Sequence, residues 1–233
     1  MQNLQSLQSL SKGQIVSSEQ RLSSYITGLS GLIAYYPLNE TSGDAINRAP
    51  DTFGTLNGTV TGATQGVAGQ VGNAYSFDGT NDFVSIADNN IFDALPEVTV
   101  FVMLKMGTSS AFEKVIFKNA VFDIGVNDSG VIFGELNSVS NPGGWGDTEI
   151  DDDEWHMCAI TYDGVEIVCY VDGDPVESLG GLSGSLGTGG AALELGRHAD
   201  NLNEYYSGSM QHFAIYNTAL SPAQISNISE LFF

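Results

Sequence analysis

The stretch Glu149-Ile150-Asp151-Asp152-Asp153-Glu154 holds the residues best suited to carboxylate chemistry. Two carboxyl groups can cleave a sugar bond when they flank it about 5–5.5 Å apart, one as nucleophile and one as acid/base. That chemistry requires Glu149, Asp151 and Glu154 to lie on one strand and face a groove. Three consecutive aspartates have low β-propensity and suit a solvated turn, and the aromatic groove that a sugar-cleaving site needs is missing apart from Trp145. We therefore interpret the run as a turn and expect no catalytic residue.

The remaining reactive side chains form no catalytic pattern. His156, His198 and His212 have no HExxH or CxxC companions, and the sequence contains no Gly-x-Ser-x-Gly elbow. His156, directly after Trp155, is interpreted as a structural surface histidine. The sequence thus predicts a protein that is not an enzyme.

Charge excludes two classes of partner. The 233 residues include 28 acidic and 7 basic ones, for a net charge of -21. Binding to phosphate depends on lysine and arginine, so nucleic acid and anionic membrane are not expected as partners. The excess of acid favours solubility in a salty environment, with cation binding as the alternative. The sequence contains no run of 18 apolar residues, so it predicts no transmembrane helix.

A β-hairpin is predicted over residues 154–173, around the turn at Asp163-Gly164. A two-residue turn would pair Tyr162 with Val165, Ile160 with Ile167, and Cys158 with Cys169. These residues would then form one apolar face, as in a sheet with one side in a core. Buried, reduced thiols are favoured for the two cysteines, and a cross-strand disulfide is the alternative.

Other segments also read as strands, and together they predict an all-β, two-sheet antiparallel sandwich. Residues 97–106 are apolar on both alternations, which predicts a central strand buried on both faces. Residues 51–72 contain six glycines and are expected to form a long exposed loop. Ser221-Pro222 predicts one short C-terminal helix, with serine as N-cap. Further strands are expected at 32–37, 74–77, 83–86, 115–117, 121–126, 131–136, 175–179, 192–196 and 209–216.

Four segments in register resemble the laminin-G-like, concanavalin A-like jelly rolls. They are LIAYYPLNETSGDAINRA, GNAYSFDGTNDFVSI, WHMCAITYDG followed by YVDG, and LGRHADNLNEYYSGSMQHFAIYNTALSPAQI. Together they span roughly residues 31–228. The resemblance implies a jelly-roll fold but no single activity, because this fold hosts lectins, adhesion modules, enzymes and structural parts. The acidic run also formally matches the E-x-D-x-x-E motif of laminarinase-type glycoside hydrolases, so hydrolysis by Glu149 and Glu154 is one alternative.

The resemblance also implies a possible Ca²⁺ site at the sandwich edge. The matching positions are Asp44, Gly72-Asn73 and Gln211, which would offer the carboxylate, carbonyl and amide oxygens that Ca²⁺ takes. Relatives commonly carry an acidic pair in the last strand, where this sequence has Gln211-His212. That departure removes negative charge from the expected site.

Glycan binding requires aromatic platforms beside amides and acids. Trp145 in NPGGWGD, and Asn203, Tyr205 and Tyr206 in DNLNEYY, are the predicted ligand-binding residues. A sugar can lay its apolar face on a ring while polar side chains take its hydroxyls. For Tyr206, packing in the core is the alternative.

Residues 1–30 differ from the rest and are interpreted as an N-terminal arm for anchoring or assembly, followed by a jelly-roll domain over 31–233. The arm is rich in Gln and Ser and has no apolar stretch typical of a signal peptide. We therefore hypothesise a recognition module held by other subunits in a large assembly, specifically a phage or virus head or tail decoration or fibre protein. It would lie at the virion surface or outside the cell, and a cell-surface glycan is a possible ligand. A stand-alone bacterial carbohydrate-binding or adhesion protein is the alternative.

Overall fold

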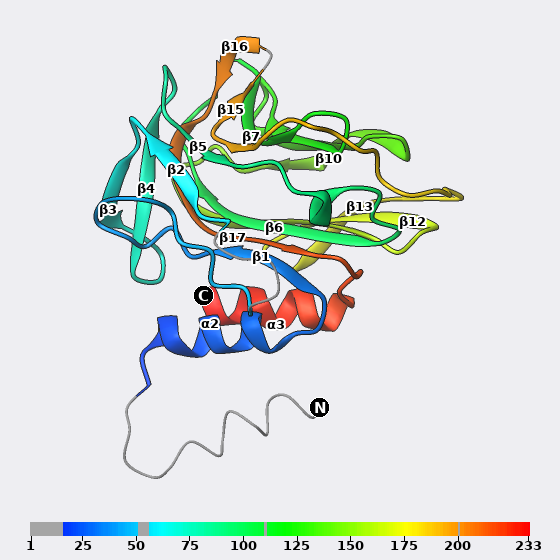
Figure 1. The fold of residues 1–233 in the computed structure, drawn as a ribbon, viewed down its shortest axis with the longest axis horizontal. Coiled ribbons are helices and arrows are strands. Elements are labelled where there is room, and N and C mark those ends of the chain that lie inside the picture. Colours follow the sequence, from blue (N-terminus) through cyan, green and yellow to red (C-terminus); the bar gives the residue numbers. More distant parts are fainter. Residues whose placement is uncertain (1–15, 51–55, 110, 200) are drawn as a thin grey trace.

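The protein is a sandwich of two antiparallel sheets, as the sequence predicted, and it carries two helices on one side where only the C-terminal one was expected (Figure 1). The structure, a computed structural model, describes residues 16–50, 56–109, 111–199 and 201–233, and gives only the backbone for 140–146 and 201–203. In these residues, eight strands form what we call the back sheet, in the order β13-β12-β11-β6-β17-β4-β3, with β1 paired to β17. Seven form the front sheet, in the order β10-β9-β8-β7-β14-β5-β2.

The back-sheet strands are β1 (Leu32–Tyr36), β3 (Thr64–Ala68), β4 (Asn73–Asp78), β6 (Val98–Lys105), β11 (Trp155–Tyr162), β12 (Glu166–Val171), β13 (Asp174–Gly180) and β17 (Ser207–Tyr216). The front-sheet strands are β2 (Gly58–Thr61), β5 (Phe83–Ile86), β7 (Glu113–Lys118), β8 (Phe122–Val126), β9 (Val131–Leu136), β10 (Ser140–Glu149) and β14 (Leu193–Leu195). The other elements are the hairpin β15 (Arg197–His198) and β16 (Asn201–Tyr205), the 3-10 turn η1 (Asn90–Phe92), and the helices α2 (Ser18–Gly28) and α3 (Pro222–Phe232).

The predicted central strand is β6, which lies between β11 and β17. Seven of its eight residues are buried, because one face meets the front sheet and the other meets the helices. Val100, Val102 and Leu104 point into the core between the sheets, whereas Phe101 and Met103 point into a second core on the helix side.

The second core explains both helices. α2 buries Leu22, Tyr25 and Ile26 against the back sheet, and α3 buries Ile225 and Ile228 beside them. Each helix begins with a capping box, in which serine and the glutamine three residues later satisfy each other's backbone N–H groups. The segment predicted as an arm is therefore divided. Its residues 1–15 lie outside the described residues, and its helix packs on this chain's own sheet.

The predicted register of the central hairpin was wrong by two residues. Tyr162 pairs with Ile167, Ile160 with Cys169, and Cys158 with Val171. The cause is a wider turn, closed by Asp163, whose Oδ1 accepts hydrogen bonds from the backbone N–H groups of Val165 (2.9 Å) and Glu166 (2.8 Å). A shift of two keeps every side chain on its predicted face, because the period of a strand is two. The opposite face is buried too, under the helices.

The expectation of one long loop over 51–72 was also wrong, since the part that the structure describes contains β2 and β3. Gly58 starts β2 where a Cβ would lie 2.5 Å from Val84 Cγ1, so its glycine permits close strand pairing. By contrast, the predicted Gly/Ser loop over 180–190 is irregular from 181 onward.

Candidate functional site

The outer face of the front sheet, which we call the front face, gathers charged and aromatic side chains from several strands. Lys114 of β7 forms an ion pair with Asp123 of β8 and lies 3.5 Å from Glu204 Oε2 of β16. Its Nζ is 4.7 Å from the ring centroid of Phe133 on β9, a cation–π arrangement. The Lys114 side chain is only 5% exposed, so it organises this surface from beneath.

Lys114 reaches the front face because β7 contains a β-bulge. The pairing shifts between Lys114, opposite Gly125, and Ile116, opposite Ile124. The extra residue, Val115, points into the core together with Ile116. A bulge reorients the side chains beside it, and here it turns Lys114 outward.

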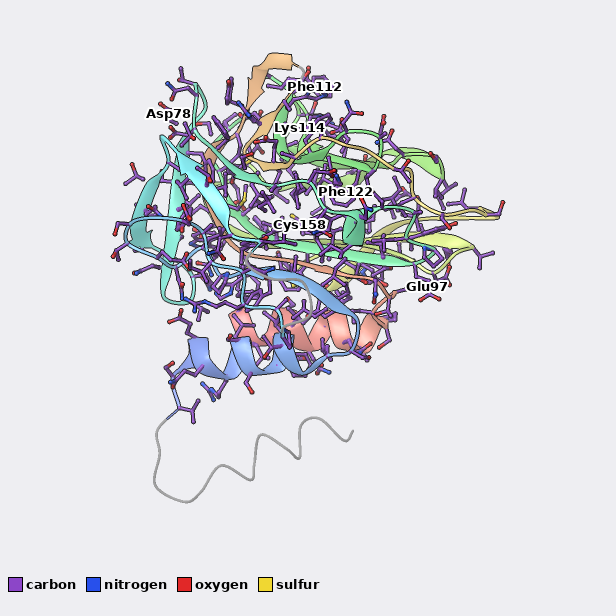
Figure 2. All side chains as sticks on the ribbon, in the orientation of Figure 1. Asp78, Glu97, Phe112, Lys114, Phe122 and Cys158 are labelled. Carbon is purple, nitrogen blue, oxygen red and sulfur yellow. The ribbon has the colours of Figure 1, made fainter. Side chains whose placement is uncertain are left out.

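Two phenylalanines form an aromatic platform beside the lysine. Phe133 lies across Gly125, its cross-strand partner, where a Cβ would lie 2.9 Å from Phe133 Cζ. Phe112 meets Phe133 edge to face, with ring centroids 5.6 Å apart, and is 52% exposed. Figure 2 shows Phe112 and Lys114 on the side of the molecule away from the helices.

The hairpin β15–β16 extends this surface. The His198 ring stacks on Phe117 of β7, with centroids 3.9 Å apart, and its Nε2 lies 4.0 Å from Asp123 Oδ2. Arg197 donates two hydrogen bonds of 3.2 Å to Glu194 and lies 3.4 Å from the ring centroid of Phe83. The front face therefore consists of flat rings alternating with carboxylates whose positions are fixed by internal cations.

The predicted ligand-binding residues lie in different environments. Tyr206 is fully buried, packs edge to face on Phe77 and has its hydroxyl 3.1 Å and 3.0 Å from the carbonyl oxygens of Lys105 and Ser209. Core packing therefore accounts for Tyr206. Tyr205, partly exposed, pairs across the hairpin with Arg197.

The side chains of Trp145 and Asn203 lie outside the described residues, but their backbones place them near the front face. Trp145 follows Gly144 in β10, and Gly144 pairs with Phe133. Asn203 is next to Glu204 in β16. The strands thus bring Trp145, Asn203 and Tyr205 to the sheet and hairpin that carry Lys114 and Phe133.

The acidic run forms the turn that its composition predicted. Glu149 ends β10 in the front sheet, whereas Glu154 immediately precedes β11 in the back sheet. Asp151 accepts a hydrogen bond from Ser109 N–H at 2.8 Å, and Asp152 accepts one from Glu154 N–H at 2.9 Å. Because the run crosses from one sheet to the other, the two glutamates do not share the strand that the hydrolase motif requires.

The four residues predicted to bind calcium do not all lie in the same part of the structure. The structure brings Asn73 and Gln211 together, since a Cβ on the neighbouring Gly69 would lie 3.0 Å from the Asn73 carbonyl oxygen and 2.0 Å from Gln211 Oε1. Gly72 lies in the same loop, against Glu19 of α2. Asp44 is exposed on another loop.

This set fits Ca²⁺ poorly. Gln211 Oε1 accepts a hydrogen bond from Gln70 N–H at 2.9 Å, which orients the amide. Its Nε2, a donor, meets no hydrogen-bond partner among the described residues, and a donor is no ligand for a cation. Nor do three His, Cys, Asp or Glu side chains gather as a metal site anywhere in the described chain. Calcium binding therefore stays a prediction.

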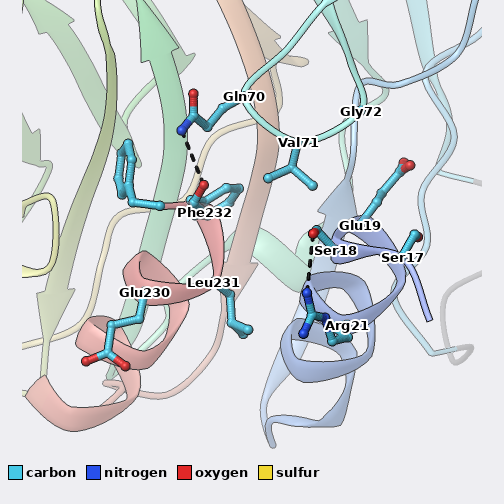
Figure 3. A pocket seen from close by; sticks show the side chains of 11 residues that line it. Ser17, Ser18, Glu19, Arg21, Gln70, Val71, Gly72, Glu230, Leu231 and Phe232 are labelled. Carbon is cyan, nitrogen blue, oxygen red and sulfur yellow. Dashed lines mark hydrogen bonds between the residues drawn. The ribbon is translucent and has the colours of Figure 1, made fainter. Parts of the chain in front are cut away.

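A cavity of 560 Å³ lies on the opposite side of the molecule, between the ends of α2 and α3 and the loop around Val71 (Figure 3). Its polar groups largely bind one another: Gln70 Nε2 donates to the Phe232 carbonyl at 3.3 Å, and Arg21 donates to Ser18 Oγ at 3.4 Å. This cavity is therefore a packing gap between the helices and the loop beside the sheet, and we do not assign it as the candidate site.

Sequence reasoning missed Phe112, Lys114, Phe133 and Glu204. The alternation in residues 131–136 gave a usable signal, because Ile132 and Leu136 are buried while Phe133 between them points outward. The bulge that turns Lys114 outward left no such signal.

Comparisons with known proteins agree with the fold. A family model described as the concanavalin A-like lectin/glucanases superfamily matches residues 78–226. No curated protein matches the chain in sequence. Among the described helices, none has the length and apolar composition needed to cross a membrane.

Several solved structures share the fold at low identity. Domain 4 of the GH43 extracellular arabinanase AbnA from Geobacillus stearothermophilus, solved with arabinotriose, superposes with a TM-score of 0.62 at 18% identity, covering 85% of this chain and 98% of that domain. The binding domain of Paraclostridial Mosquitocidal Protein 1 gives 0.65 at 15% identity, covering 89% of this chain. The ligand binding domain of Botulinum neurotoxin serotype D, solved with N-acetylneuraminic acid, gives 0.64 at 13% identity and 90% coverage. This chain spans about half of either toxin domain, 52% in both cases.

Proposed function

The chain belongs to the concanavalin A-like lectin/glucanase superfamily, and we propose that it is a non-enzymatic carbohydrate-binding module whose ligand lies on the front face. Two structural neighbours support the class of ligand, since one was solved with arabinotriose and another with N-acetylneuraminic acid. The separation of Glu149 and Glu154 between two sheets supports binding without hydrolysis.

One observation carries the choice of surface. The back sheet buries its outer side chains under α2 and α3, whereas the front face holds the exposed Phe112 ring beside carboxylates that internal cations orient. A pyranose or furanose ring presents C–H groups on one face and hydroxyls at its rim. The C–H face can pack on Phe112, and hydroxyls can donate to the carboxylate oxygens of Asp123 and Glu204.

The test is a glycan array with purified protein, followed by affinity measurements on a bound glycan with two variants. Phe112→Ala is expected to weaken binding at least tenfold, about 1.4 kcal/mol, with little change in melting temperature. Val165→Ala is the matched control, since Val165 is 56% exposed but lies in the β11–β12 turn of the back sheet. Unchanged affinity in Phe112→Ala would move the ligand off the front face, and no binding to any glycan would contradict the function.

Display on a larger assembly, with a phage or virus surface as the specific hypothesis, is a further part of the proposal. Its support is the Gln/Ser-rich composition of residues 1–15. The helix that follows them, α2, is packed on the back sheet and so attaches this segment to the body of the protein. Deleting residues 1–15 keeps α2 intact and so tests the arm alone. Light scattering should show a smaller assembly, and an unchanged size would count against this role.

A further inference from the structure

The charges of the front face bear on which glycans it can accept. Resting on the proposed function, we propose that the ligand is an uncharged glycan and that the front face excludes sugars bearing carboxylate or sulfate groups.

The basic residues of the front sheet and its hairpin are engaged by the protein's own acids. Lys114 lies between Asp123 and Glu204, and its side chain is 5% exposed. Arg197 makes two hydrogen bonds to Glu194 and covers the Phe83 ring. An anionic sugar would have to displace these carboxylates to reach either cation.

Lys118, at the end of β7, is removed from the surface altogether. Its side chain is fully buried, and its Nζ lies 2.6 Å from Asp88 Oδ1 and donates to the carbonyl oxygens of Gly189 and Ala191, both at 2.9 Å. This lysine holds the irregular loop before β14 and is unavailable to a ligand.

Three further cations in the described chain lie elsewhere. Arg21 lies on α2, Arg48 is 3.7 Å from Glu40, and Lys105, on the back sheet, is 3.6 Å from Asp153. The described part of the front face therefore offers a ligand carboxylates and rings but no unpaired cation.

Carboxylates select by what they can accept. Asp123 and Glu204 are hydrogen-bond acceptors, which suits the hydroxyl donors of a neutral sugar. A ligand carboxylate or sulfate is also acceptor-only, so it would receive no hydrogen bond from these two carboxylates and would face like charge. Such repulsion is a usual way to reject a near-identical ligand. The chain's net charge of -21 adds to this effect at low salt.

An array of matched oligosaccharide pairs tests the proposal, with members that differ only by a sialic acid, a uronic acid carboxylate or a sulfate. At low salt, neutral members should bind at least tenfold more tightly than their acidic counterparts, and the gap should narrow at about 0.3 M salt as charges are screened. Preference for acidic members would overturn the charge inference while leaving glycan binding intact. Binding to no member would overturn both.

Two variants distinguish local charge from net charge. Glu204→Gln removes one front-face carboxylate and should reduce the gap between neutral and acidic members severalfold. Glu166→Gln removes an exposed carboxylate from the back sheet and reduces the net negative charge by the same one unit. It should therefore leave the affinity difference between neutral and acidic members unchanged. Equal effects of the two variants would contradict selection by the front face.

Discussion

The back sheet turns Phe101, Tyr170 and Tyr216 outward onto two helices, whereas the front sheet turns Phe117, Asp123 and Phe133 outward with no helix of the described chain above them. One outer face is a second hydrophobic core, and the other is a surface of rings and paired charges. The difference indicates a division of labour: substitutions on the helix side should cost stability, and substitutions on the front face should cost binding.

The largest expected effect comes from shortening a residue under α2. Leu22 is fully buried in the helix-side core, so Leu22→Ala should lower the free energy of unfolding by about 2–5 kcal/mol, through lost burial and the cavity left behind. Urea denaturation measures this change. Ser24→Ala, on the exposed side of the same helix, is the control and should change stability little. A small effect of Leu22→Ala would mean that α2 is not an integral part of the fold.

Acid should weaken the helix side through His212. This buried residue lies between Tyr35, whose hydroxyl is 2.8 Å from Nδ1, and the Phe232 ring, and burial lowers its pKa to about 4. As pH falls from about 6.5 to 4, His212 becomes protonated in the unfolded state but stays neutral in the folded state. The free energy of unfolding should therefore fall by about 3 kcal/mol over that range. His212→Asn keeps a residue tolerant of the left-handed backbone here (φ 50°) and should remove this component of the pH dependence. Parallel profiles for both proteins would refute the assignment.

His156 should give the stability of the protein the opposite dependence on pH, and the effect should be smaller than that of His212. Its ring lies 2.7 Å from Asp172 and 3.1 Å from Asp152, and hydrogen bonding to Asp172 is the main cause of a raised pKa. Its stabilising effect is therefore complete below about pH 6.5 and is lost as pH rises through the raised pKa. The stability difference between wild type and His156→Gln should shrink from pH 6 to pH 8.5. A difference that grows with pH would contradict a stabilising role for the protonated ring.

The smallest expected effect is that of calcium. Because the Gln211 amide is held by Gln70, the melting temperature should be the same in excess Ca²⁺ and in EDTA. A rise in Ca²⁺ that disappears in Gln211→Ala would show that this site binds the ion after all.

The same comparison explains what the sequence could predict. The jelly roll follows from four segments that together resemble a known family. By contrast, β6 and the N-terminus of α3 follow from patterns within single segments: a doubly apolar run for β6, and Ser221-Pro222 for the helix. The hairpin's faces could be predicted but not its register, because the side chain of Asp163 decides the width of the turn.

The front face depends on contacts between strands, some neighbouring and some far apart in the sequence. Phe133 lies over Gly125, Lys114 faces Glu204 some ninety positions later in the chain, and a bulge at Val115 sets the direction of Lys114. Propensity and spacing describe one strand at a time, so they identified Trp145 and Tyr205 nearby but could not assemble the cluster.

The strands at the margins of the sandwich bear on association between copies of the chain. An outermost strand with free N–H and C=O groups can recruit a strand from another molecule. Here β13 carries Pro175 and a bulge against β12, β10 carries Pro142, β3 is bulged beside Gly66, and β2 is four residues long. Prolines remove backbone donors and bulges distort the edge that a new strand would pair with. The outermost strands of both sheets are therefore poorly suited to pairing with a strand of another molecule.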